Sequence, residues 1–163
     1  MTAPALFDPA DGPPNGWPSS AAADRAYLEA FATQGSQTLI ANLRTQMMGL
    51  RSGDRIFPLT INEAEYGDAY VCLPHSAYAL YAKDELRIEN VGVWTPALGL
   101  LASSAGALLR AARVNRIVNL DNWMLSTNLH GDWRGEDVPD IRRFLATRFP
   151  DHMIATRCLN EWS

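Results

Sequence analysis

The sequence has one lysine, two cysteines and no run of like charge in its 163 residues. Cys72 and Cys158 are too far apart to indicate a disulfide framework or a zinc pattern, so we expect buried free thiols in a cytoplasmic protein. The net charge of −4 and the scattered arginines argue against a nucleic-acid partner. The three histidines match no ligand spacing, and we predict no metal site.

Charge is also absent from residues 91–109, VGVWTPALGLLASSAGALL. Their number approaches the roughly 20 predominantly apolar residues that a membrane-spanning helix needs. The segment nevertheless contains Pro96, three glycines and several hydroxyl groups. We therefore predict a buried helix whose small residues allow close packing, and no membrane partner.

Proline is concentrated at the start of the chain, where residues 1–19 hold five of the ten prolines. Proline fixes φ and removes a backbone donor, so this segment is predicted to be a tail without regular structure. Residues 20–163 are predicted to form one domain, because a chain of this size can bury a substantial core.

Hydrophobic periodicity and turn residues predict the order of the elements. The first element is a helix capped by Ser19 or Ser20 and ended by Gly35, and strands over 37–50, 56–62 and 69–73 follow it. Helices over 74–88 and 95–113 come next, and then a long strand over 115–129. The last two elements are a helix that begins at Asp137 and stops before Pro150, and a strand over 152–159. Pro58 predicts that its strand lies at an edge. The fold class is therefore α+β, with a mixed, partly antiparallel sheet flanked by helices.

Residues 122–133, NWMLSTNLHGDW, have the rhythm of a strand but carry several amides and hydroxyls, a histidine and two tryptophans. Asn122, Ser126 and Asn128 fall on one face by alternation, and His130 follows them. A buried, unpaired side chain of this kind would cost about 1–3 kcal/mol. Two interpretations remain open: a polar network that satisfies itself at the end of a strand, or a substrate groove lined by these four residues.

Three stretches together resemble a known family: YVCLPHSAYALYAKDEL (70–86), VNRIVNLDNWMLSTNLHGDW (114–133) and RFPDHMIATRCLNE (148–161). They look like the first half of longer bacterial proteins grouped with the GNAT-type acyl-CoA N-acyltransferases, some of which resemble the Fem-type aminoacyl transferases. The resemblance covers about residues 38–160. It implies an acyl-CoA N-acyltransferase-like fold and a second half beyond this one.

The family binds the cofactor pyrophosphate at a glycine-containing turn that leads from a strand into a helix. The corresponding turn here is Cys72–Ser76, which has no glycine and contains Pro74. His75 and Ser76 are the candidate cofactor-binding residues that the resemblance implies. Cys72, three residues before His75, could be a thiolate nucleophile at a helix start, but a buried thiol is the favoured interpretation.

Two functions follow as expectations. The first is transfer of an acyl group from acetyl-CoA, or another acyl-CoA, to a small-molecule amine held by Asn122, Ser126, Asn128 and His130, with no catalytic base identified. The alternative is a non-catalytic binding or dimerisation module of the same fold whose cofactor turn is degenerate. An exposed edge at the last strand would allow a homodimer.

Overall fold

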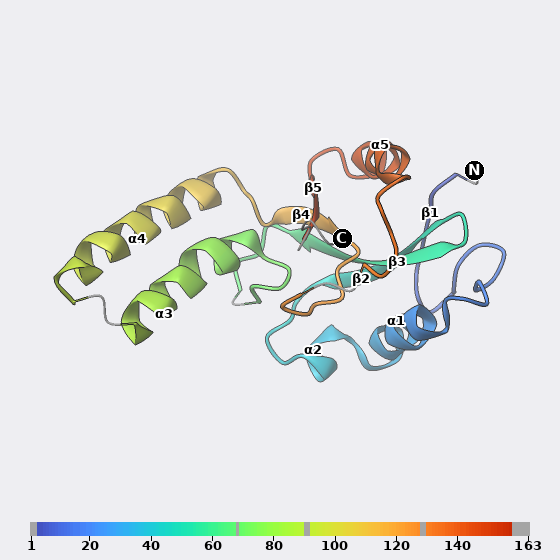
Figure 1. The fold of residues 1–163 in the computed structure, drawn as a ribbon, viewed down its shortest axis with the longest axis horizontal. Coiled ribbons are helices and arrows are strands. Elements are labelled where there is room, and N and C mark those ends of the chain that lie inside the picture. Colours follow the sequence, from blue (N-terminus) through green and yellow to red (C-terminus); the bar gives the residue numbers. More distant parts are fainter. Residues whose placement is uncertain (1–2, 68, 90–91, 128–129, 158–163) are drawn as a thin grey trace.

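Five strands form one mixed sheet in the order β1-β2-β3-β4-β5 in the computed structural model, which describes residues 3–67, 69–89, 92–127 and 130–157 (Figure 1). They are β1 (Ala5–Phe7), β2 (Gln46–Ser52), β3 (Arg55–Glu63), β4 (Arg116–Leu120) and β5 (Met153–Thr156). Only β4 and β5 are parallel, and helix α5 (Val138–Arg148) connects them. This confirms the predicted α+β class with a mixed, partly antiparallel sheet.

The remaining helices lie on the other face of the sheet or project beyond it (Figure 1). Helices α1 (Ala22–Gln34) and α2 (Ser36–Leu39) lie on the face opposite α5. The π-helical turn η1 (Ser76–Leu80), α3 (Tyr81–Ile88), the 3-10 turn η2 (Gly92–Trp94) and α4 (Thr95–Ala111) form a helical hairpin that extends away from one end of the sheet. The predicted helices at 74–88 and from Thr95 are therefore confirmed.

The main core lies between the sheet and α5. Alternate residues of β3 face it, as the sequence predicts, because successive side chains of a strand point to opposite sides. The buried members of this core are Leu50, Phe57, Leu59, Ile61, Val118, Leu120, Trp133, Ile141 and Leu145. Each fully buried leucine or isoleucine contributes roughly 1.5–3 kcal/mol, so this face accounts for much of the stability.

Residues 3–19 are not a tail without regular structure, so the prediction is wrong for this part of the chain. Residues 5–7 pair with β2 in an antiparallel register that sets Phe7 opposite Gly49. The ring of Phe7 lies across Gly49, where a Cβ atom would come within 2.1 Å of the ring. Trp17 meets Phe7 edge to face at 5.6 Å. Local proline content could not show this pairing, because the strand is stabilised by a partner more than 40 residues away.

Pro58 lies in the middle of the sheet, not at its edge. Strand β3 is flanked by β2 and β4, and Pro58 pairs with Gly49 of β2. The carbonyl of Pro58 accepts the N–H of Asn122 at 3.0 Å, on the side where β4 has already ended at Leu120. The N–H and C=O of one strand residue point to the same side, so a backbone N–H at position 58 would also point past the end of β4. Proline lacks this N–H, and no strand hydrogen bond is lost as a result.

Several predicted boundaries also differ. The N-cap of α1 is Ala21 without a side-chain hydrogen bond, so neither Ser19 nor Ser20 caps it, although Gly35 ends the helix with φ 81° as predicted. Residues 37–50 are not one extended run, because α2 occupies 36–39 and the strand begins at Gln46. Residues 69–73 form a turn instead of a third strand.

The long strand predicted over 115–129 ends at Leu120. Asp121 and Met124 take positive φ values of 55° and 53°, which turn the chain away from the sheet. The polar stretch that begins at Asn122 therefore follows the end of the strand and is not part of it.

Helix α4 is not buried. Gly106 is its only residue classed as buried, and its leucines are largely exposed. The prediction failed because an apolar helix normally covers a core, whereas α4 packs mainly on η1, α3 and η2, and its last turn contacts the Tyr66 ring through Arg110.

Replacing Gly49 with alanine tests the attachment of β1. The added Cβ must displace the Phe7 ring, so we expect Gly49→Ala to lower the free energy of unfolding by about 1–3 kcal/mol, the usual cost of overpacking. Gly99→Ala is the matched control, because nothing lies within 4 Å of its added Cβ. Urea denaturation measures both; equal effects of the two substitutions would contradict the packing of Phe7 on Gly49.

Candidate functional site

Buried asparagines of β4 and its flanks hold the loop of residues 64–73 against the sheet. The side-chain amide of Asn115 donates to the Glu65 carbonyl at 2.8 Å, and that of Asn119 donates to the Cys72 carbonyl at 3.1 Å. Asn122 donates to the Val71 carbonyl at 3.0 Å. These three residues, which we call the asparagine row, are almost completely buried. The row replaces the strand pairing that the loop lacks.

Thr60 of β3 completes this arrangement. Its hydroxyl oxygen accepts from Asn122 at 2.9 Å and from Asn119, its register partner in β4, at 3.3 Å. The face is polar because the alternate residues Val118 and Leu120 point into the core on the α5 side. Burying amides is tolerated here since each hydrogen bond that they make offsets the cost of leaving water.

Asn122, a predicted substrate-binding residue, is fully committed to structure. Besides its two amide donations, its side-chain oxygen accepts the N–H of Met124 at 3.1 Å and lies 3.3 Å from the guanidinium of Arg157. Arg157 also donates to the Val71 carbonyl. The side chain of Asn122 thus has no hydrogen-bonding capacity left for a substrate.

His130 forms a buried pair with Asp121. Its Nδ1 lies 2.7 Å from the Asp121 carboxylate, whose other oxygen accepts the indole N–H of Trp123 at 3.0 Å. Its Nε2 lies 2.9 Å from the Arg157 carbonyl, so it must donate to that oxygen. Burial raises the pKa of the Asp121 carboxyl above its usual value, against the lowering influence of His130 and Trp123. Both ring nitrogens are occupied, and neither can accept a proton from a substrate in this arrangement.

A pocket of about 240 Å³ lies beside this pair and is acidic. Four carboxylates line it, from Asp24, Asp54, Asp121 and Asp132. Arg55 is bound to Asp132 at 2.8 Å and lowers the pKa of that carboxyl. The chemistry of the wall suits a small cation better than a phosphate or a carboxylate.

The other two predicted substrate residues are Ser126 and Asn128. Ser126 is exposed on the turn after β4, and Asn128 lies outside the described residues. The structure therefore joins Asn122 and His130, both through Arg157, and supports the self-satisfying network for these two residues.

The candidate cofactor turn is filled by the protein itself. The N–H of His75 donates to the Asn115 side chain at 2.9 Å, and the Ser76 hydroxyl donates to the Gly67 carbonyl. His75 is buried between the Tyr66 ring and Arg110, whose Nε donates to His75 Nε2 at 3.2 Å. Burial, together with the Arg110 charge, lowers the pKa of His75. Cys72 is buried as well, and burial raises the pKa of its thiol to about 12. Cys158 lies outside the described residues.

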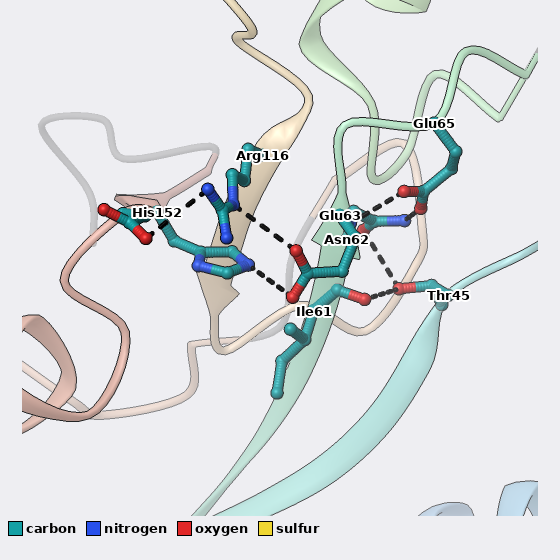
Figure 2. A network of polar contacts seen from close by, with 8 residues as sticks. Thr45, Ile61, Asn62, Glu63, Glu65, Arg116 and His152 are labelled. Carbon is teal, nitrogen blue, oxygen red and sulfur yellow. Dashed lines mark hydrogen bonds and ion pairs between the residues drawn. The ribbon is translucent and has the colours of Figure 1, made fainter.

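A second polar network closes the end of the sheet at Glu63, and Figure 2 shows its side chains converging. The Glu63 carboxylate lies 3.1 Å from His152 and 3.3 Å from Arg116, which also lies 3.5 Å from Asp151. Both carboxylates are mostly exposed. Pairs of this kind contribute little, roughly 0–1 kcal/mol, and we assign them no chemistry.

Asn62 links that end of the sheet to the loop, as Figure 2 also shows. Its amide donates to the Arg44 carbonyl at 3.1 Å and to the Glu65 carboxylate, and its oxygen accepts from the Thr45 hydroxyl at 3.0 Å. Asn62 therefore extends to β3 the role that the asparagine row has on β4.

Sequence reasoning missed Asp121, Thr60 and Arg157. The parity of the strands offered a signal, because Thr60 and Asn119 fall on the faces opposite Leu59 and Val118. No comparable signal existed for Arg157, whose guanidinium reaches Val71 from 86 positions along the chain.

Within the described ranges, no group of three or more histidine, cysteine, aspartate or glutamate side chains is arranged to hold a metal ion. The same ranges contain one helical segment, Gly92–Ala111, that is long and apolar enough to cross a membrane, and 11% of it is buried. The predictions of a cytoplasmic protein and of no membrane partner stay predictions.

Comparison with models of protein families, with curated proteins and with solved structures found no match.

Substituting Asn122 with alanine tests the structural role of the asparagine row. It removes one of the two donors to the Thr60 hydroxyl and one of the two to the Val71 carbonyl, and it leaves the Met124 N–H without its partner, so we expect a loss of about 1–3 kcal/mol in the free energy of unfolding. The exposed Asn42→Ala is the control and should change it by less than about 0.5 kcal/mol. An unchanged free energy of unfolding in Asn122→Ala would show that the Asn122 side chain does not stabilise the loop of residues 64–73.

Alkylation of Cys72 tests its burial. The raised pKa keeps the thiol protonated below pH 12, so at pH 8 the thiolate fraction is roughly a thousandfold below that of an ordinary cysteine. In a Cys158→Ser background, we expect iodoacetamide to modify Cys72 only after unfolding in urea. Mass spectrometry of the intact chain measures the added mass, and rapid modification of the native protein would be inconsistent with this burial.

Proposed function

We propose that this chain is a non-catalytic interaction module built on an acyl-CoA N-acyltransferase-like sheet, and that it binds its partner through the helical hairpin. The observation that carries the proposal is that α4 exposes large apolar side chains to water. Its small residues face α3, whereas Leu100, Leu101 and Leu108 point to solvent. A water-facing helix normally has the opposite arrangement, and apolar surface of this kind marks a contact site.

The helix starts offer no place for the pyrophosphate of coenzyme A, which supports the same proposal. Where the helix opens at Pro74, the N–H of His75 is bound to Asn115 and that of Ala77 to the Leu73 carbonyl. At the start of α5, the buried Asp137 and the neighbouring Asp140 already place carboxylates at the positive end of the helix dipole. A phosphate would be repelled there.

Acyl transfer to an amine is the second candidate, and the acidic pocket beside His130 favours it. A protonated amine would be attracted to Asp24 and Asp54 on the wall of that pocket. The reaction would still need a base, and His130 would have to leave either Asp121 or the Arg157 carbonyl to supply one. The interaction module needs no such rearrangement.

Calorimetric titration with acetyl-CoA separates the two candidates. We expect no saturable heat up to millimolar cofactor, because the His75 N–H is already bound to Asn115 and the carboxylates at the start of α5 would repel the pyrophosphate. An acetyltransferase of known affinity in the same buffer is the positive control. Saturable binding in the micromolar range would overturn the interaction module and favour acyl transfer.

A further inference from the structure

Helix α4 packs on the rest of the helical hairpin with its smallest side chains. The less exposed positions recur at intervals of four and three, and they are Thr95, Gly99, Ala102, Gly106 and Leu109. A Cβ on Gly106 would lie 3.1 Å from the Cβ of Ala79 and 3.3 Å from His75, so the two segments touch backbone to side chain. These residues leave the opposite face of α4 uncovered.

The uncovered face carries a second series with the same spacing. Its members are Ala97, Leu101, Ser104, Leu108 and Ala111, and all five are exposed. Leu101 is 65% and Leu108 72% exposed, and the adjacent Leu100 is 70% exposed. We call these five residues the outer seam. Alternation of four and three residues is the spacing that packs one helix against another.

The outer seam carries no charge and presents no unpaired hydroxyl donor. The hydroxyl of Ser104 donates to the Leu100 carbonyl at 3.0 Å, and that of the neighbouring Ser103 donates to Gly99 at 2.7 Å. Covering this face would therefore cost no hydrogen bond to water from these hydroxyls. Burying each leucine there would gain roughly 1.5–3 kcal/mol.

The order of side chains along the outer seam reads the same in both directions: Ala, Leu, Ser, Leu, Ala. An antiparallel second copy, related by a two-fold axis at Ser104, would set Ala97 level with Ala111 and would bring Leu101 within one residue, about 1.5 Å along the axis, of Leu108. Each leucine layer would then be flanked by layers of small residues, which let the helices approach closely. A surface that matches itself in this way is what a two-fold interface requires.

We propose that two copies of this chain dimerise by antiparallel pairing of α4 along the outer seam; this rests on the proposed interaction module. The exposed apolar area supports a stable contact. Leu100, Leu101 and Leu108 are each at least 65% exposed, so pairing would remove three large apolar side chains per chain from water. Antiparallel pairing also sets the two helix dipoles in opposite directions, which is favourable.

Charge favours a second copy over a lipid surface. Interfacial helices that bind anionic membranes carry lysine and arginine on their polar side. The helix beside α4 instead carries Asp84, Glu85 and Glu89 against Lys83 and Arg87, and the whole chain has a net charge of −4. The spacing of four and three residues along the outer seam also suits contact with another helix and gives no advantage on a lipid surface.

Sedimentation equilibrium of the full chain is the first test. We expect a species of twice the 18.0 kDa chain mass. The double variant Leu101→Glu and Leu108→Glu should weaken the dimer by about 100-fold or more, because two charges would be buried at the centre of the interface. Tyr78→Glu, equally exposed but on η1, is the matched control and should leave the dimer intact. Circular dichroism checks that every variant is folded.

Cysteine cross-linking tests the register in a Cys158→Ser background. Ser104→Cys places two thiols at the two-fold axis, near the Cα separation of about 4.4–6.8 Å that a disulfide needs. Ala97→Cys places them about 21 Å apart at a rise of 1.5 Å per residue, so it should cross-link only when combined with Ala111→Cys. Non-reducing gels after mild oxidation distinguish these cases.

Each outcome decides between the proposals. Dimers lost in the double variant and cross-linked at Ser104 would support pairing along the outer seam. A wild-type monomer at 100 μM, a dimer unaffected by the double variant, or binding of the monomer to phosphatidylcholine vesicles through α4 would overturn it. If acetyl-CoA still gives no heat, those three results would overturn only the dimer and leave the proposed interaction module in place. Saturable binding of acetyl-CoA would overturn the interaction module, whatever the oligomeric state.

Discussion

The architecture depends on the amide hydrogen bonds that one face of β4 makes to a loop without secondary structure. Asn115, Asn119 and Asn122 bind three carbonyls of residues 64–73, and Asn115 also accepts the N–H of His75 at the base of the helical hairpin. The direction in which η1 and α3 leave the sheet is therefore set by these side chains. Because each amide is buried, loss of one partner would leave an unsatisfied group in the interior.

The same hydrogen bonds explain why the polar residues of the interior make poor catalytic groups. His130 has carboxylate and carbonyl partners on its two nitrogens, and His75 is neutral and enclosed by Tyr66 and Arg110. A catalytic side chain needs a free donor or acceptor at the moment of reaction. The helical hairpin has the opposite property, because Leu100, Leu101 and Leu108 of α4 are largely exposed to water. The functional proposals accordingly concern the surface of α4.

Parts of this structure could be predicted from local sequence. The helices that begin at Pro74, Thr95 and Val138 follow proline or hydrophobic periodicity, and Phe57, Leu59 and Ile61 occupy the expected face of β3. A self-satisfying network was one of the two interpretations left open for Asn122 and His130, but its other members were not identified. Thr60, Asp121 and Arg157 reach them through loops and across strands, and a single sequence gives no measure of those distances.

The sequence by itself determined the α+β class, the parallel crossover through α5 and the apolar character of α4, because each depends on composition and spacing within a short segment. Tertiary structure alone decided that residues 5–7 join the sheet, that Pro58 is central and that α4 is exposed. In each of these cases the outcome depends on which surface a segment meets. Which surface a segment meets depends on the total burial and hydrogen bonding of the whole chain, and it cannot be predicted from the periodicity of a short segment.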